Sequence, residues 1–190
     1  MCGFVGFTND INDSNQVLQK MLDSIQHRGP DAEGTYIDED IALGHRRLSI
    51  IDVTNAGNQP LYSEDGNLVL IYNGEIYNYK DIRKRLQKAG YHFATQTDSE
   101  VLIYGYREYG PELLQQLRGM FSFVIWDKSQ KIVVWRTRFL RHQATLLCPD
   151  AGYIPVRLRN QKLLTSSPLQ KSAEHNCTGK LSDISVFTLR

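Results

Sequence analysis

The stretch Cys2-Gly3-Phe4-Val5-Gly6-Phe7 opens the chain with an apolar run that contains two glycines and is followed by polar turn residues at 8–10. Such a run is typical of a buried β-strand. Apolar residues then recur at helical spacing over residues 17–25, after a polar cluster at 13–15 and before Gly29-Pro30. The sequence therefore predicts a strand followed by a helix.

Further strands and helices are expected as far as residue 135. Strands are predicted at 34–37, 41–46, 68–72, 120–126 and 131–135, and helices at 78–88 and 99–109. Most of these strands form neighbouring hairpins, and the helices are grouped between them. This order favours an α+β layered fold over a doubly wound parallel sheet. After Trp135 neither the strand nor the helix period continues, so no element is predicted there.

Composition and charge exclude several classes of protein. The chain has 190 residues, 41% hydrophobic and 23% charged, which is typical of a globular protein with one core. No apolar run approaches the roughly 20 residues that a membrane-spanning helix needs. The start of the chain lacks the pattern of a signal peptide. We therefore expect a cytoplasmic protein without a membrane partner.

The cysteines and basic residues indicate neither a metal site nor a nucleic-acid surface. Cys2, Cys148 and Cys177 have no metal-binding or disulfide spacing, so no metal is expected. Residues 138–190 carry eight Lys and Arg against three Asp and Glu, but these charges are scattered, with almost no aromatic residues between them. A nucleic-acid partner is therefore not expected either.

Cys2 is the first candidate for chemistry. Removal of Met1 would leave a thiol and a free α-amino group on one residue. The amine, with an ordinary pKa of about 7.7 to 8.0, can accept the proton of a thiol whose ordinary pKa is about 8.5, through a water. The alternative is that Cys2 is a small apolar residue that opens a strand.

Asn73-Gly74-Glu75 is the second candidate, because it directly follows an apolar strand. A side-chain amide beside a glycine N–H can supply two donors to a developing oxyanion. The alternative is a plain turn, since Asn-Gly is also the commonest hairpin signal.

Arg47 and Asp98 form the third candidate. An α-amino acid has a carboxylate and an ammonium group, which one Arg and one Asp could bind. The alternatives are that Arg47 is a surface cation and that Asp98 or Ser99 caps the following helix. A polar loop at 27–31, His-Arg-Gly-Pro-Asp, has no assigned role beyond that of a turn.

Taken together, these segments resemble a known family. The motifs MCGFVGF, HRGPD, GHRRLSIID, NGEIYNY, TDSE and GMFSFVIWD occur in the order found in the glutamine amidotransferase domain of asparagine synthetases. The resemblance implies an α+β fold of the N-terminal-nucleophile hydrolase type, a four-layer αββα sandwich of antiparallel sheets, incomplete here at the C-terminus. It implies a glutamine amidotransferase type-2 domain over residues 1–137.

The resemblance also implies roles for individual residues. Cys2 would be the nucleophile, and Asn73 and Gly74 would form the oxyanion hole. Arg47 would bind the α-carboxylate of L-glutamine and Asp98 its α-amino group. The rest of the pocket would be lined by Leu48, Ser49, Ile50, Ile51 and Glu75.

Residues 138–190 depart from the family, and we interpret them as a divergent, out-of-frame and poorly ordered tail. Relatives continue into a stretch like RDRFGIKPLYY and then FASEI. With suitable synonymous codons, a reading frame shifted by one base here yields IKPLYYA, FASEI and TALENYLTF. Loss of the family's later strands would leave a sheet edge open. The nucleotide sequence across codons 130–190 tests this interpretation.

The expected function is that of the glutaminase half of an asparagine synthetase, which hydrolyses glutamine to glutamate and ammonia. No cofactor is expected for this chain, whereas ATP and Mg²⁺ belong to the synthetase domain, which would have to be supplied by a separate domain or chain. One alternative is an inactive, non-catalytic remnant of a disrupted gene. Another is an amidotransferase that serves a different acceptor through a partner chain.

Overall fold

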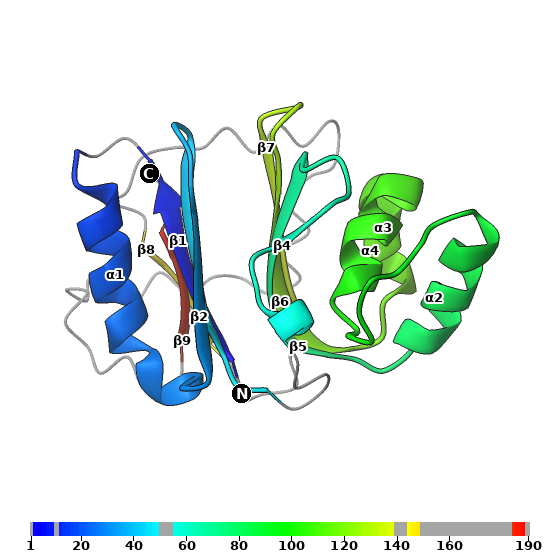
Figure 1. Cartoon of the computed structure of the whole chain (residues 1–190), viewed down its shortest axis with the longest axis horizontal. Coiled ribbons are helices and arrows are strands. Elements are labelled where there is room, and N and C mark those ends of the chain that lie inside the picture. The colour runs from blue at the N-terminus through cyan, green and yellow to red at the C-terminus, as the bar shows by residue number, and fades with distance from the viewer. Residues whose placement is uncertain (1, 10–11, 50–54, 139–143, 149–183, 189–190) are drawn as a thin grey trace, which may run out of the picture.

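A computed structural model of the protein describes residues 2–9, 12–49, 55–138, 144–148 and 184–188, with the backbone alone in the last two ranges. In this part of the chain, four layers stack in the order helix, sheet, sheet, helices (Figure 1). The α+β class and the αββα layering predicted above are confirmed.

The strands of the two sheets come from different parts of the chain. The first sheet has the order β2-β3-β1-β9-β8 and the second the order β4-β5-β6-β7. The strands are β1 (Gly3–Thr8), β2 (Ala32–Ile37), β3 (Ile41–Arg47), β4 (Leu61–Tyr62), β5 (Leu68–Ile76), β6 (Gly119–Asp127), β7 (Ile132–Arg138), β8 (Ala144–Cys148) and β9 (Ile184–Thr188). The helices are α1 (Ser14–Ser24), α2 (Tyr79–Lys88), α3 (Glu100–Tyr109) and α4 (Leu113–Gln116), with 3₁₀ turns η1 (Gln26–Arg28), η2 (Asn55–Gly57) and η3 (Gly110–Glu112).

The elements predicted up to Trp135 are present, with shifted ends and one marked extension. β5 continues from Leu68 through the Asn-Gly pair to Ile76, where the prediction ended at Tyr72. All neighbouring strands pair antiparallel except at β9, which runs parallel to both β1 and β8. The first sheet is therefore mixed, whereas only antiparallel pairing was expected.

Because alternate residues of a strand face opposite sides, β5 contributes side chains to two hydrophobic cores. Val69 and Ile71 pack between the sheets, against Phe4 from β1 and Leu43 from β3. The intervening residues of β5, such as Leu70, pack instead against the helices on the other face of the second sheet. A strand buried on both faces reads as a continuous apolar run, which is why 68–72 is so strongly hydrophobic.

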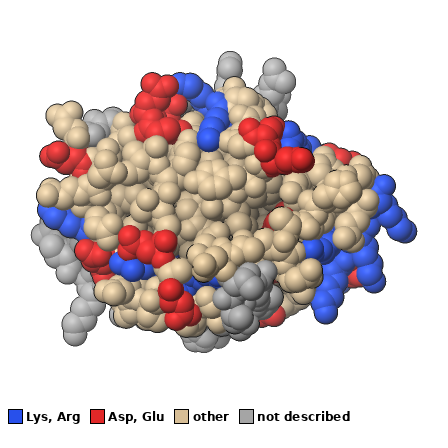
Figure 2. Space-filling view, viewed as in Figure 1, with Lys and Arg blue, Asp and Glu red and all other residues tan. Residues whose placement is uncertain are grey.

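The outer helices cover the sheets through amphipathic faces. α1 buries Leu18 and Leu22 against the first sheet. α2 buries Ile82 and Leu86 on the other side of the molecule, and its basic residues other than the partly buried Arg83 are exposed. Figure 2 shows these basic side chains gathered at the end of the molecule where α2 lies. Apolar residues three and four apart thus give each helix one face toward the core.

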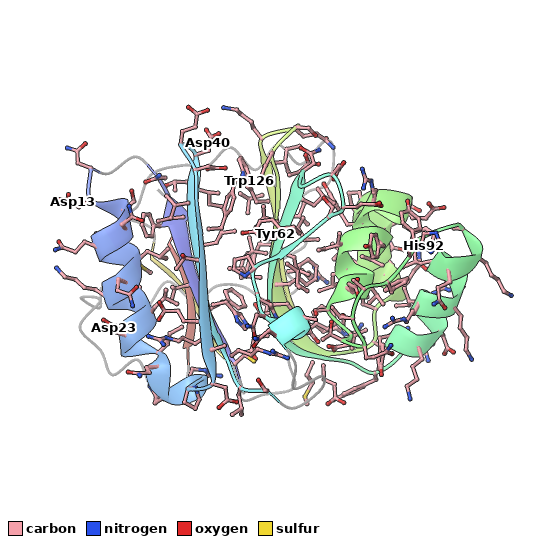
Figure 3. All side chains as sticks on the ribbon, in the orientation of Figure 1. Asp13, Asp23, Asp40, Tyr62, His92 and Trp126 are labelled. Atoms are coloured by element: carbon pink, nitrogen blue, oxygen red, sulfur yellow. The ribbon has the colours of Figure 1, made fainter. Side chains whose placement is uncertain are left out.

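Polar contacts at both ends of the sheets join one sheet to the other. His45 Nε2 on β3 lies 3.0 Å from the carbonyl oxygen of Tyr72 on β5, to which it donates a hydrogen bond. At the other end of the sheets, Trp126 Nε1 donates to Asp38 Oδ2 at 2.8 Å, and Figure 3 shows the Trp126 side chain between the two sheets. These directional bonds fix how the first sheet lies relative to the second, because apolar packing alone has no preferred direction.

The end of the chain is described only in part. β9 lies beside β1, with Val5 opposite Val186, and occupies the edge that the sequence analysis expected to be open. No strand was predicted at β8 or β9, because pairing along a strand edge uses main-chain groups and needs no side-chain pattern. Residues 149–183 lie outside the described part of the structure, so the interpretation of 138–190 as a poorly ordered tail stays a prediction.

Replacement of Ile71 by Ala should destabilise the protein strongly. Its side chain is fully buried between the sheets, so truncation removes apolar contacts and leaves a cavity. We expect the free energy of unfolding, measured in urea, to fall by about 2–5 kcal/mol. Gln87→Ala on the exposed face of α2 is the control and should change it by less than about 0.5 kcal/mol. Equal effects of the two variants would contradict the packing of β5 described here.

His45 should make stability depend on pH. Burial, with a smaller contribution from the charge of Arg47, lowers the pKa of His45 from 6.5 to about 4. Between these values the unfolded chain binds a proton that the folded chain does not, so the free energy of unfolding falls as the pH is lowered. The slope from this one group is at most about 1.4 kcal/mol per pH unit.

The measurement is urea unfolding at several pH values between 7 and 4. His45→Gln should flatten the dependence, whereas His92→Gln should leave it as in the wild type; His92 is exposed on the helical side of the molecule (Figure 3). A slope that is the same in wild type and His45→Gln would contradict the burial of a neutral imidazole at this position.

Candidate active site

The thiol of Cys2 lies against the backbone at the end of β3. Its Sγ accepts a hydrogen bond from the Leu48 N–H at 3.3 Å, and the thiol donates to the Leu48 carbonyl at 3.6 Å. The antiparallel pairing of β1 with β3, with Gly3 opposite Arg46, brings these residues together. Cys2 is a free cysteine and is partly exposed, so the thiol is held in place and still accessible.

The polar loop at 27–31 holds the backbone on both sides of this contact. Arg28 Nε donates to the carbonyl oxygen of Cys2 at 3.2 Å. Asp31 Oδ2 accepts from the Ser49 N–H at 2.7 Å. Between them, Gly29 presses against β3 so closely that a Cβ there would lie 2.3 Å from the backbone of Arg46. The loop is therefore part of the site, and not only the turn that the sequence suggested.

The second part of the site is the edge of β5 that lies beyond the end of β4. β4 pairs with β5 only through Leu61 and Tyr62. Farther along β5, side chains take the place of the missing strand: Gln59 Oε1 accepts from the Tyr72 N–H at 2.6 Å, and His45 Nε2 donates to the Tyr72 carbonyl. The backbone groups of Tyr72 therefore point away from β6, toward this edge.

Gly74 directs its N–H to the same edge, where no described residue is recorded as its hydrogen-bond partner. In an antiparallel ladder, alternate residues direct their backbone groups to the same side. Tyr72 and Ile76 both do so here, because the Ile76 N–H donates to Asp98 Oδ2 at 2.8 Å. The N–H of Gly74 lies between these two, and Gly74 itself is exposed. It is thus available to a ligand that reaches the edge of the sheet.

The turn interpretation of Asn73-Gly74 is wrong, because both residues lie within β5. Gly74 has φ +146°, and a Cβ at this position would lie 2.3 Å from the carbonyl oxygen of Met120 on β6. A residue with a side chain would therefore clash with the neighbouring strand. The glycine is required by the pairing of the two strands as well as by access to its N–H.

Asn73 lies beside Gly74, and its side-chain amide is buried. It is 2% exposed, and among the described residues its Nδ2 has no hydrogen-bond partner. By the strand period, its side chain lies on the same face of β5 as Ile71, toward the first sheet, which carries Cys2. Since buried amide groups are normally paired, an unpaired Nδ2 at this place is suited to a ligand oxygen.

Asp98 does not cap the following helix. Its Oδ2 accepts from the hydroxyl of Tyr72 at 2.5 Å and from the Ile76 N–H, both on β5. Ser99 occupies the N-cap position of α3, without a side-chain capping bond, so the capping interpretation is wrong for Asp98 only. Burial raises the pKa of Asp98, and the hydrogen bond from Tyr72 acts in the opposite direction. The structure therefore places a buried carboxylate at the same edge of β5 as Gly74.

Arg47, at the end of β3, is buried, so its interpretation as a surface cation is wrong as well. It is 5% exposed, and its Nη1 donates to Asn58 Oδ1 at 2.7 Å. It immediately precedes Leu48, whose backbone holds the thiol. A guanidinium fixed at this place can bind a carboxylate of a ligand that lies against Cys2.

The remaining predicted residues are placed as follows. Leu48 contacts Cys2, and Ser49 is partly buried beside it. Glu75 is exposed next to Gly74 and near enough to Asp98 to affect its charge. Ile50 and Ile51 lie outside the described residues. Among those that are described, no three His, Cys, Asp or Glu side chains gather into a group that could hold a metal ion.

Sequence reasoning missed Tyr72, His45 and Gln59, which fix the edge of β5. A histidine two residues after Leu43 in a predicted strand could have been placed on the buried face, since alternate residues share a face. Tyr72 is indistinguishable by sequence from any other aromatic residue of an apolar strand. Gln59 lies in a loop, where no pattern indicates that its side chain replaces a strand.

The chain is similar in sequence to known proteins. The profile of the glutamine amidotransferase domain family matches residues 1–142. Glutamine-hydrolysing asparagine synthetase 1 of Bacillus subtilis is 47% identical over 138 residues, which are 70% of this chain and 22% of that protein. Glutamine-hydrolysing asparagine synthetase B of Escherichia coli is 41% identical over 133 residues, 68% of this chain and 24% of that protein. The chain therefore spans about a fifth to a quarter of the length of these relatives.

Solved structures show the same fold. Glutamine phosphoribosylpyrophosphate amidotransferase from B. subtilis, complexed with ADP and GMP, matches with a TM-score of 0.54 and 22% identity. The match covers 67% of this chain and 35% of that one. Within the described residues, no helix is long and apolar enough to cross a membrane. By its sequence profile, its relatives and its fold, the chain belongs to the glutamine amidotransferase domain family.

Proposed function

We propose that this chain hydrolyses L-glutamine to glutamate and ammonia, as the glutaminase part of an asparagine synthetase in the cytoplasm. The observation that carries the proposal is an accessible Cys2 thiol, fixed at Leu48, together with the buried Asn73 Nδ2, which has no hydrogen-bond partner among the described residues and lies beside the N–H of Gly74. A thiol and preorganised oxyanion donors are what acyl transfer from a carboxamide requires.

In the proposed reaction, the Cys2 thiolate attacks the side-chain carbonyl carbon of glutamine. With Met1 removed, the α-amino group of Cys2 accepts the thiol proton and passes it to the leaving nitrogen, so that ammonia departs and a γ-glutamyl thioester remains. Water then hydrolyses the thioester to glutamate and regenerates the thiol. Asn73 Nδ2 and the Gly74 N–H stabilise the oxyanion formed in both steps.

Charged side chains bind the α-carboxylate and the α-ammonium group of the substrate. Arg47 binds the α-carboxylate and Asp98 the α-ammonium, while Leu48, Ser49, Ile50, Ile51 and Glu75 line the rest of the pocket. Hydrolysis needs no cofactor or metal. ATP and Mg²⁺ enter only with a synthetase part, in which the ammonia would be joined to aspartate; neither a nucleic acid nor a membrane is a proposed partner.

Glutamate release from glutamine by the full chain tests the proposal, after intact-mass analysis has shown that Met1 is removed. We expect release by the wild type and none above background for Cys2→Ala, because the nucleophile is lost. Cys177→Ala is the matched control and should keep the activity. If the wild type with Cys2 as its first residue releases no glutamate, the alternative of an inactive remnant holds.

Gly74→Ala should lower kcat by at least about a hundredfold, the cost of losing an oxyanion donor. The added Cβ clashes with β6 and displaces the Gly74 N–H from the edge. Gly66→Ala is the control, because Gly66 also has a positive φ, +68°, but has open space around it. Far-UV circular dichroism verifies that both variants fold. A Gly74→Ala variant with wild-type kcat would contradict the role of this N–H.

A further inference from the structure

Tyr72 is tied to its surroundings at three points. Its hydroxyl donates to Asp98 Oδ2 at 2.5 Å, its N–H donates to Gln59 Oε1 at 2.6 Å, and its carbonyl accepts from His45 Nε2 at 3.0 Å. It is 4% exposed and immediately precedes Asn73. The two backbone bonds hold the strand that carries Asn73 and Gly74, and the hydroxyl bond ties this strand to Asp98.

The hydroxyl of Tyr72 helps to stabilise the charged form of Asp98, which needs hydrogen bonds because the carboxylate is buried. It is 5% exposed, and the contacts that other described residues make to its carboxylate are both on Oδ2, from Tyr72 and Ile76. A buried carboxylate is costly unless hydrogen bonds favour its charged form. The nearby charge of Glu75 has the opposite effect, because it opposes ionisation of Asp98.

The two bonds on Oδ2 also set the direction of the carboxylate. Two donors from one strand, one from a side chain and one from the backbone, fix the plane of the group relative to β5. Oδ1 is then the oxygen that no other described residue contacts through a hydrogen bond. Without the hydroxyl of Tyr72, only backbone N–H groups, those of Ile76 and of Asp98 itself, would remain to hold the carboxylate, and no side chain would fix its direction.

We propose that Tyr72 is a positioning residue for substrate recognition, whose hydroxyl holds Asp98 in the orientation that binds the α-ammonium group of glutamine. This rests on the proposed function. Tyr72 does not touch the reacting atoms. It joins the carboxylate at one end of the substrate to the strand that carries Asn73 and Gly74 at the other end.

The test uses two reagents that alkylate thiols. 6-Diazo-5-oxo-L-norleucine carries the α-amino and α-carboxylate groups of glutamine, whereas iodoacetamide carries neither. The rate constant of Cys2 labelling by each reagent is measured by intact mass on the full chain, with the reagent below saturation. KM and kcat for glutamine hydrolysis are measured on the same samples.

Tyr72→Phe keeps the ring and the backbone contacts and removes only the hydroxyl. We expect labelling by the diazoketone to slow at least about tenfold, as for loss of a hydrogen bond to a charged group, and labelling by iodoacetamide to stay within about twofold. KM should rise by a similar factor, with kcat little changed. Tyr104→Phe, in the same hydrophobic cluster, is the matched control and should leave all four quantities unchanged.

Asp98→Asn provides a second check. If Tyr72 acts through Asp98, adding Tyr72→Phe to Asp98→Asn should slow diazoketone labelling no further, because interacting residues are not additive. Equal slowing of both reagents by Tyr72→Phe, or no slowing, would overturn this inference alone. A wild-type Cys2 that reacts with iodoacetamide and not with the diazoketone would overturn the proposed function, and the inference with it.

Discussion

Beyond the short strand β4, no strand in the described part of the chain pairs with the edge of β5, and the candidate site depends on which groups bond to this edge instead. Gln59 and His45 bond the backbone of Tyr72, and Asp98 bonds that of Ile76. The intervening N–H, on Gly74, has no recorded partner among the described residues, and in the proposed function it binds the oxyanion. A free backbone donor between bonded ones is rigid as well as available, so it needs no reorganisation when charge develops on a bound oxygen.

The four-layer fold places the thiol opposite this edge. Cys2 directly precedes β1 and Arg47 ends β3, both strands of the first sheet, whereas Asn73 and Gly74 belong to the second sheet. Packing of the sheets through Phe4 and Ile71, with a directional bond from His45, brings the two sets together. The site therefore lies where the two sheets meet, and a change in how they pack alters its geometry as directly as a change in one of its residues does.

Most of the fold could be predicted from the sequence, because hydrophobic periods and glycine turns mark the elements from β1 to β7. The roles of individual residues were harder to predict than the elements. The helix cap expected at Asp98 is replaced by bonds to β5, and the turn expected at Asn73 is part of a strand, since the same residue types serve either role. Strands β8 and β9 pair through main-chain groups, which leave no pattern in the sequence. Tyr72 and Gln59 act through contacts between segments that lie 13 or more residues apart.

A crystal structure of the protein alkylated at Cys2 by 6-diazo-5-oxo-L-norleucine tests the central claim most directly. The ketone oxygen of the adduct occupies the place of the oxyanion formed from glutamine. We predict that it lies about 2.7–3.1 Å from both Asn73 Nδ2 and the Gly74 nitrogen. An adduct whose oxygen points away from the edge of β5, or is bound by other donors, would contradict the account.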